Sequence, residues 1–225
     1  MTAISHLKRG ITALTITATL FLSVGAAFPA ADKEIVINPR PVAKAPTCKP
    51  KPKDCTVIGR VTGFQVQVGS KRGATTVPVD GRIVSWSTTL GDPGKHKEFF
   101  DGIFGKGAQA RIATLRQVES KPGRYRLLGQ SEPVDLEPFF GSSPAFQLSR
   151  SLRVRRGDVV ALTVPTWAPL FAVNESNADA WRADRSSKKC NDVKKGTVHK
   201  RGDRPYDCLF RTAQLIYSAV LVPNS

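Results

Sequence analysis

The sequence predicts an all-β protein, built as a two-sheet β-sandwich of jelly-roll-like form with about nine short strands. Apolar side chains recur at every second position in several segments, which gives a strand one dry face and one wet face. Turn signals such as Asp80-Gly81 and Lys121-Pro122-Gly123 separate these segments. Apart from single helical turns at 97–104 and 178–185, no window carries a helical apolar repeat. An immunoglobulin-like sandwich is the alternative arrangement.

Three of the strand candidates show this alternation. Phenylalanine and valine alternate with glutamine at 64–68, and leucine and valine alternate with arginine at 152–155. The last segment, 213–221, puts its apolar residues on one face and most of its polar residues on the other. The remaining candidates are 76–79, 82–88, 110–117, 124–130, 145–149 and the continuous apolar run 159–164.

The first 27 residues have the order of features found in an export signal. Lys8 and Arg9 precede an uncharged apolar run at 11–24, and the small residues 25–27 follow it. This run is shorter than the roughly 20 residues that a membrane-spanning helix needs. We therefore expect residues 1–27 to be a signal peptide and the mature protein to be secreted, extracellular or associated with the cell surface. An uncleaved anchor is the alternative.

Residues 28–56 are predicted to form a Pro/Lys-rich linker with a short cysteine loop. Within it, the stretch Asn38–Cys55 contains five prolines and five basic residues. Proline removes a backbone donor and fixes an extended dihedral angle, so regular helix and central strand are both disfavoured there. The β-sandwich domain is then expected to cover 57–225, beginning near Val57.

The four cysteines form two couples that are local in sequence, Cys48 with Cys55 and Cys190 with Cys208. An even number of cysteines in an exported chain predicts disulfides, and local pairing is favoured over the two other possible pairings. We expect the Cys48–Cys55 ring to lie outside the core. Zinc binding is the rival interpretation, but neither Cys-x-x-Cys nor His-x3-His is present. No metal site, cofactor or oligomeric state is assigned from the sequence.

Several segments resemble those of known proteins. They are DGRIVSWSTT (80–89), ARIATLR (110–116), YRLLGQSEPVDL (125–136), LRVRRGDVVALTVPTWAP (152–169) and YDCLFRTAQLIYSAVLV (206–222). Together they resemble a group of uncharacterised secreted bacterial β-sandwich, jelly-roll-like proteins without assigned function, over roughly 57–222. The resemblance implies the fold and brings no catalytic residues with it.

Catalytic patterns are scarce. No Gly-x-Ser-x-Gly is present, and His96 and His199 lie in Lys-rich segments with turn signals. A carboxylate pair for glycoside hydrolysis has several candidates in loops, but spacing in the sequence does not bring any two together. These candidates are Asp80, Asp92, Asp101, Asp135 and Glu137. The sequence thus favours a non-catalytic protein and names no catalytic residue.

Positive charge is the main functional signal. The formal net charge is +16, and removing Lys8 and Arg9 with the signal peptide leaves +14. The segment Arg182–Arg204 holds nine Lys or Arg against three Asp. Such a segment attracts anionic polymers without reading a nucleic-acid sequence, although a solvated loop is the simpler interpretation. The predicted contact residues are Lys188, Lys189, Lys194, Lys195, Lys200 and Arg201.

Aromatic residues give the alternative function, a lectin-like carbohydrate-binding or carbohydrate-active domain. Trp167 lies where Thr166–Pro169 interrupts the strand pattern as a loop would, so its ring could stack on a sugar. Burial in the core is the commoner fate of tryptophan. The glycine-rich stretch Gly91–Gly107 carries large apolar residues that could cover a ligand, contact lipid or close one end of the sandwich. No membrane-spanning segment is expected after cleavage.

Processing provides the first test. Export should remove residues up to about Ala27, because only that end combines positive charge, a short apolar run and small residues. The intact mass of the protein recovered outside the cell measures the cleavage position. Recovery of the full chain with Met1 would contradict the signal-peptide prediction.

Overall fold

Three long antiparallel strands form the centre of the larger sheet, β2 (Ile58–Val68), β9 (Val159–Ala168) and β5 (Gln109–Gln117). The run Val159–Val164 is apolar without alternation because β9 lies between the other two strands and is buried along this length. The complete order of the sheet is β12 (Asp203–Pro205), β6 (Arg124–Gln130), β5, β9, β2, β11 (Ala180–Ala183) and β13 (Cys208–Arg211), with β3 (Lys71–Arg72) on β2 and β7 (Val134–Asp135) on β5.

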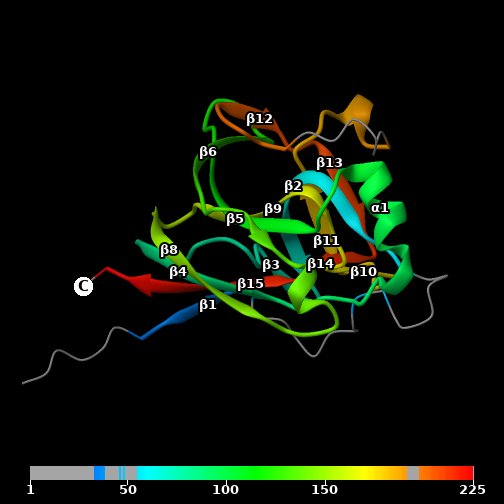
Figure 1. Cartoon of the computed structure of the whole chain (residues 1–225). Coiled ribbons are helices and arrows are strands. Elements are labelled where there is room, and N and C mark those ends of the chain that lie inside the picture. The colour runs from blue at the N-terminus through cyan, green and yellow to red at the C-terminus, as the bar shows by residue number, and fades with distance from the viewer. Residues whose placement is uncertain (1–32, 39–45, 47, 49–54, 192–197, 225) are drawn as a thin grey trace, which may run out of the picture. The chain divides into compact units, whose positions relative to one another are not determined.

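A second sheet lies below the larger, curled sheet in Figure 1. Its order is β1 (Ile35–Ile37), β15 (Tyr217–Pro223), β4 (Gly81–Thr88) and β8 (Ala145–Val154). A separate pair joins β10 (Phe171–Val173) to β14 (Ala213–Leu215). Every ladder between these strands is antiparallel, so the all-β prediction is confirmed.

The two sheets share a core. Trp86, Ile83 and Leu221 from the second sheet are almost fully buried, and the ring of Trp86 packs 4.7 Å from that of Phe146. Tyr217 donates its hydroxyl proton to the carbonyl of Val160 at 2.9 Å, which joins β15 to β9 across the interior. Burial of each such large apolar side chain contributes about 1.5–3 kcal/mol.

Helical structure is limited to one short α-helix and three 3-10 turns among the described residues. The helix α1 (Lys97–Phe104) confirms the helical turn predicted there. The turn predicted at 178–185 is wrong, because Ala180–Ala183 pairs with β2 and β13 as strand β11. The 3-10 turns are η2 (Gly94–His96), η3 (Glu137–Phe139) and η4 (Ser187–Lys189).

The computed structural model describes residues 33–38, 46, 48, 55–191 and 198–224. They belong to one unit, Asp32–Ser225. The predicted signal peptide and most of the predicted linker lie outside the described residues. The described part contains fifteen strands rather than about nine, since irregular pairings and turns divide the sheets into several pieces of two to four residues.

Two expectations about the N-terminal side are corrected. The folded part does not begin near Val57, because Ile35–Ile37 pairs with Leu221–Ala219 at the edge of the second sheet. Both predicted disulfides are present, but the Cys48–Cys55 ring is not outside the core. Cys48 is only 5% exposed, and its Cβ would lie 2.5 Å from a Cβ added at Gly91. Position 91 therefore needs glycine, because even the Cβ of alanine would overlap Cys48.

The two disulfides should contribute unequally to stability. In the chain-entropy model, the bond that closes 18 residues contributes about 3 kcal/mol and the bond that closes 7 about 2 kcal/mol. Replacing Cys190 and Cys208 together by serine should thus lower the free energy of unfolding more than replacing Cys48 and Cys55. Denaturant unfolding of both double variants measures the difference. A larger loss from the Cys48/Cys55 pair would show that burial outweighs loop length.

Candidate functional site

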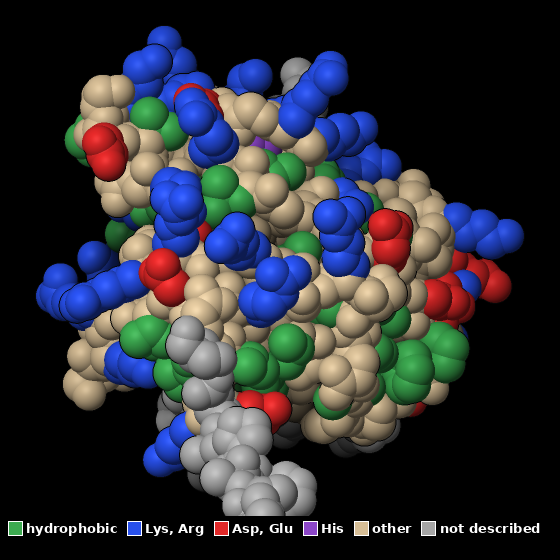
Figure 2. Space-filling view, turned by 90° about the vertical axis from the view of Figure 1, so that its left-hand side faces the viewer, with side chains coloured by type: hydrophobic (Ala, Val, Ile, Leu, Met, Phe, Trp, Pro, Cys, Tyr) green, Lys and Arg blue, Asp and Glu red, His purple; other side chains and the backbone are tan. Residues whose placement is uncertain are grey.

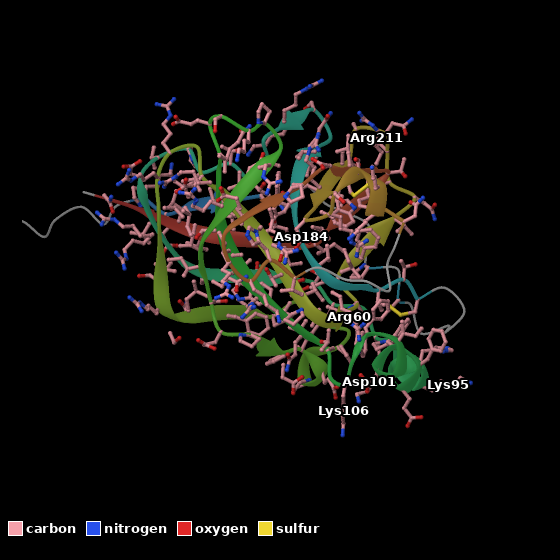
Figure 3. The ribbon with its side chains drawn as sticks, turned by 90° about the horizontal axis from the view of Figure 1, so that it is seen from above. Arg60, Lys95, Asp101, Lys106, Asp184 and Arg211 are labelled. Carbon is pink, nitrogen blue, oxygen red and sulfur yellow. A yellow bond between two sulfur atoms is a disulfide. The ribbon has the colours of Figure 1, made fainter. Side chains whose placement is uncertain are left out.

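The predicted basic segment is fixed at both ends on one residue, Thr62 in β2. On the incoming side, the Thr62 amide donates to Asp184 Oδ1 at 3.0 Å, and the Asp184 amide donates to the Thr62 carbonyl at 3.0 Å. On the returning side, the His199 amide donates to Thr62 Oγ1 at 3.0 Å. Thr62 and His199 are fully buried and Asp184 is nearly so. Asp184 and His199, which lie on either side of the basic segment, are therefore attached to the same buried residue, and Figure 3 labels Asp184 inside the ribbon.

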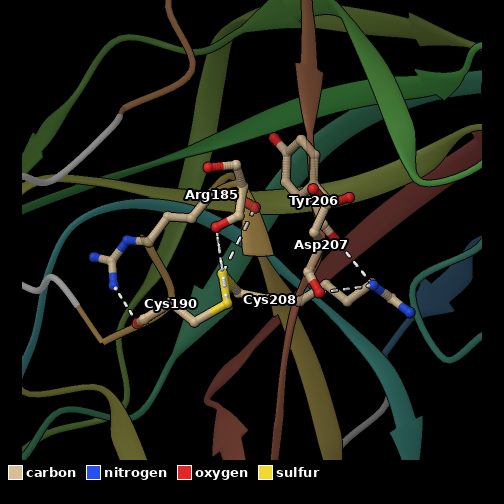
Figure 4. Close-up of a disulfide and its surroundings, with 7 residues drawn as sticks. Arg185, Cys190, Tyr206, Asp207 and Cys208 are labelled. Carbon is tan, nitrogen blue, oxygen red and sulfur yellow. Dashed lines mark hydrogen bonds between the residues drawn. A yellow bond between two sulfur atoms is a disulfide. The ribbon is translucent and has the colours of Figure 1, made fainter. Parts of the chain in front are cut away.

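A disulfide reinforces this attachment (Figure 4). Cys190 bonds to Cys208, the first residue of β13, which is paired with Ala183 of β11. The guanidinium of Arg185 donates to the Cys190 carbonyl at 3.4 Å. Covalent and polar contacts thus hold the incoming limb against β11 and β13.

Four of the six predicted contact residues are described by the structure, and all four are exposed. Lys188 and Lys189 lie on η4, and Lys200 and Arg201 lie just after the buried His199. No ion pair joins any of these four to a carboxylate among the described residues. The two remaining predicted contacts, Lys194 and Lys195, lie outside the described residues. Two pairs of predicted cations thus lie on the two described sides of the basic segment, one before and one after residues 192–197.

A buried polar cluster lies beneath the loop. His199 Nε2 is 2.8 Å from the carbonyl of Gly202, and Nδ1 is 3.0 Å from the hydroxyl of Tyr206. A carbonyl only accepts, so the Nε2–H donates to Gly202 and Nδ1 accepts from Tyr206. This arrangement suits the neutral ring, and burial lowers the pKa of His199 below its usual value.

Burial shifts the pKa of Asp184 upward, whereas it shifts the pKa of His199 downward. Burial raises its pKa to about 8, although the amide of Thr62 and the positive charges of Arg204 and Arg185 act in the other direction. The carboxyl is therefore largely protonated at neutral pH. Sequence reasoning missed this cluster because Asp184 and His199 meet at Thr62, which is more than a hundred positions away from both.

A second positive region lies on the outer side of the second sheet. Arg82 of β4 and Arg153 of β8 are exposed and directly opposite in register, and neither makes an ion pair with a described residue. Arg82 Nε instead donates to Ser151 Oγ at 2.7 Å. Like charges at opposing positions destabilise a sheet, and the exposed Arg155 and Arg156 follow at the end of β8. On the face of the molecule that Figure 2 shows, Lys and Arg outnumber Asp and Glu.

The expectation that Trp167 lies in an accessible loop is wrong. Trp167 is within β9, paired with Gly59 of β2, and is fully buried. Its ring packs between Phe100 and Phe140, with centroids 5.2 and 5.8 Å away, and its Nε1 donates to Asp101 Oδ1 at 2.8 Å. No ring face is available for a sugar.

The loop carboxylates that were candidates for catalysis have structural partners. Asp101 also accepts from the Gly107 amide and from Lys97, and these bonds with that of Trp167 lower its pKa against the opposing effect of burial. Lys97 also pairs with Glu137 at 3.2 Å. The other candidates accept backbone amides at turns, namely Asp80 from Arg156, Asp92 from Gly94 and Asp135 from Glu137.

Within the part of the chain that the structure describes, no group of three or more His, Cys, Asp or Glu side chains could hold a metal ion. Among the same residues, none of the helices has the length and apolar character needed to cross a membrane. Comparisons with known protein families, curated proteins and solved structures find no match for this chain. The resemblance to secreted bacterial β-sandwich proteins therefore stays a prediction, and function is inferred from the geometry above.

The buried carboxyl predicts a pH-dependent stability. Because the pKa of Asp184 is about 8 in the folded state and 3.8 ordinarily, its stabilising contribution is complete below about pH 4 and is lost as the pH rises toward 8. The melting temperature of Asp184→Asn relative to wild type should therefore rise between about pH 5 and pH 8. Thermal unfolding of both proteins measures this difference.

His199 acts in the opposite direction, since its lowered pKa gives a contribution that is present above 6.5 and lost as the pH falls. Both proteins retain His199, so its direct effect cancels in the comparison. A difference in melting temperature that does not change with pH would contradict the raised pKa of Asp184.

Proposed function

We propose that this protein is a secreted, non-catalytic binding module for anionic polymers, with Lys188, Lys189, Lys200 and Arg201 as its contact residues. The observation that carries the proposal is the anchoring of both limbs of the loop at Thr62, while these cations remain exposed and without ion pairs among the described residues. Because both limbs are held at Thr62, less conformational entropy is lost when the loop binds a ligand.

The charge pattern favours a polymer over a small anion. The exposed cations are spread over two limbs, and the second positive region at Arg82 and Arg153 lies on another sheet. A chain that carries repeated negative charges can neutralise several such cations at once and release its condensed counterions. The facing Arg82 and Arg153 form the second proposed contact, because an anion would relieve the repulsion between them.

A location outside the cytoplasm is part of the same proposal. Two disulfides indicate an oxidising environment, which is typical of proteins outside the cytoplasm. Cleavage after the predicted signal peptide and a jelly-roll-like sandwich arrangement of the sheets complete the proposed picture. The lectin-like alternative loses its main support because Trp167 is buried.

The test is binding of the mature protein to heparin, teichoic acid and DNA over a range of salt concentrations. We expect affinity to fall steeply with salt, and replacement of Lys188, Lys189, Lys200 and Arg201 by serine to reduce that dependence. For DNA, four lost phosphate contacts would lower the slope of log affinity against log salt by about 3 to 4. Folding should be unaffected, because exposed charges contribute little to stability.

A matched control removes the same charge elsewhere. Lys71, Arg72, Lys95 and Lys106 are exposed on β3 and around α1, and their replacement by serine lowers the net charge equally. In Figure 3, Lys95 and Lys106 point away from the molecule. Equal loss of binding in both variants would assign the effect to net charge alone. Absence of binding by wild type at low salt would refute the proposal altogether.

A further inference from the structure

The longest unpaired sheet edge in the described part of the chain belongs to β8, the last strand of the second sheet (Figure 1). It has ten residues, whereas the strands at the other ends of the two main sheets, β1, β12 and β13, have three or four. Outside its ladder with β4, no backbone hydrogen bond joins β8 to another described residue. Its outer edge therefore offers backbone N–H and C=O groups to an added strand.

Positive charge lines this edge. The strand contains Arg150 and Arg153, both exposed, and no acidic residue. Neither arginine forms an ion pair with a described residue, and Arg153 lies opposite Arg82 of β4. Two more exposed arginines, Arg155 and Arg156, follow directly after the strand. Because like charges that face each other in a sheet repel, acidic side chains on a neighbouring strand are favoured here.

The core-facing side of β8 adds apolar contacts at the same edge. Phe146, Leu148 and Leu152 are half-buried and pack against the core. The ring of Phe146 also meets that of Phe139 at 5.3 Å, and Phe139 is 36% exposed. Side chains alternate between the two faces of a strand, so an added strand places every second side chain beside these apolar groups. Its remaining side chains then lie on the face of Arg153.

The same edge disfavours pairing with a second copy of this chain. The register with β4 shifts between Ile83 and Ser85, where residues 148–151 of β8 lie opposite the single residue Val84. Such a bulge and the charged side chains both deter association between identical edges, because the arginines of two copies would repel each other. A strand with acidic side chains meets no such repulsion, and bulges also occur beside functional sites.

We propose that β8 binds an extended acidic segment of another protein by strand addition, with acidic side chains on the face of Arg82 and Arg153 and apolar side chains beside Phe146. Backbone hydrogen bonds supply the affinity, and the alternating side chains supply the specificity. The inference goes beyond polymer binding by the basic loop and does not depend on it, although Arg82 and Arg153 also belong to the second positive region.

The probe is a fluorescent heptapeptide of alternating glutamate and valine, close to the length of an ordinary strand. Its binding to the mature protein is followed by anisotropy, and hydrogen exchange reports on the amides of β8. We expect saturable binding together with slower exchange of those amides. A peptide with glutamine in place of glutamate should bind at least about threefold more weakly, because exposed ion pairs are lost.

A second peptide separates strand addition from attraction between charges. N-methylation of every amide keeps the glutamates but removes the backbone donors, so the affinity should fall by about tenfold or more. Equal affinity of the methylated and unmethylated peptides would show binding by charge alone and overturn the proposal. Absence of saturable binding by the glutamate peptide would overturn it as well. A free protein that is already a dimer with protected β8 amides would assign the edge to a second copy instead.

Two double variants locate the site. Arg150→Gln with Arg153→Gln should weaken the glutamate peptide by at least about threefold and change the glutamine peptide by less than about twofold. Arg72→Gln with Arg211→Gln is the matched control, because both arginines are exposed on other strands and the same charge is removed. Equal loss of affinity in both double variants would assign the effect to net charge and refute the location. Melting temperatures report whether each variant is folded, and the peptide series on wild type decides the matter alone if one is not.

The loop variant separates this inference from polymer binding. Replacement of Lys188, Lys189, Lys200 and Arg201 by serine should weaken heparin binding but leave peptide-induced protection of the β8 amides in place. Loss of that protection in the loop variant would place the peptide on the basic loop and contradict strand addition at β8. Failure of wild type to bind heparin would leave the peptide results unaffected, so the two proposals fail or stand separately.

Discussion

Thr62 joins three parts of the chain that are far apart in sequence. Its amide, carbonyl and hydroxyl all lie in the interior, where they meet Asp184, the amide of His199 and the hydroxyl of Thr163 at about 3.0 Å. An unmade hydrogen bond costs far more in such a place than at the surface, so each partner is strongly specified. The burial of Asp184 and His199 on either side of the basic segment follows from this meeting point, and burial raises the pKa of Asp184 although the Thr62 amide lowers it.

The Cys190–Cys208 disulfide and the hydrogen bonds to Thr62 stabilise the ends of the loop by different means. Cys190–Cys208 restricts the unfolded chain, whereas the bonds to Thr62 act only in the folded state. Together they let a strongly charged segment coexist with a well-packed interior. Within the part of the chain that the structure describes, Lys188, Lys189, Lys200 and Arg201 form no ion pair with a carboxylate, and the proposed function uses these charges to bind a polymer.

Local patterns in the sequence predicted much of the fold and little of the site. Alternation and one continuous apolar run located the long strands, and the clustered cysteines predicted both disulfides, because these features depend on neighbours in the chain. The strand β1 was missed because its three residues are too few to show a pattern and depend on β15. Trp167 was misplaced because proline-flanked residues can still pair in a sheet. The cluster around Thr62 arises from contacts between distant segments, which alternation does not encode.

The two ends of the basic loop are attached to one buried residue, Thr62, so changes within the loop need not change the packing of the interior. Residues between the two limbs can change in number and composition without disturbing Thr62, Asp184 or His199. Loop length itself has only a small thermodynamic effect. The scaffold can thus carry different segments at this position, so that related chains could acquire new surface chemistry while they keep the same interior.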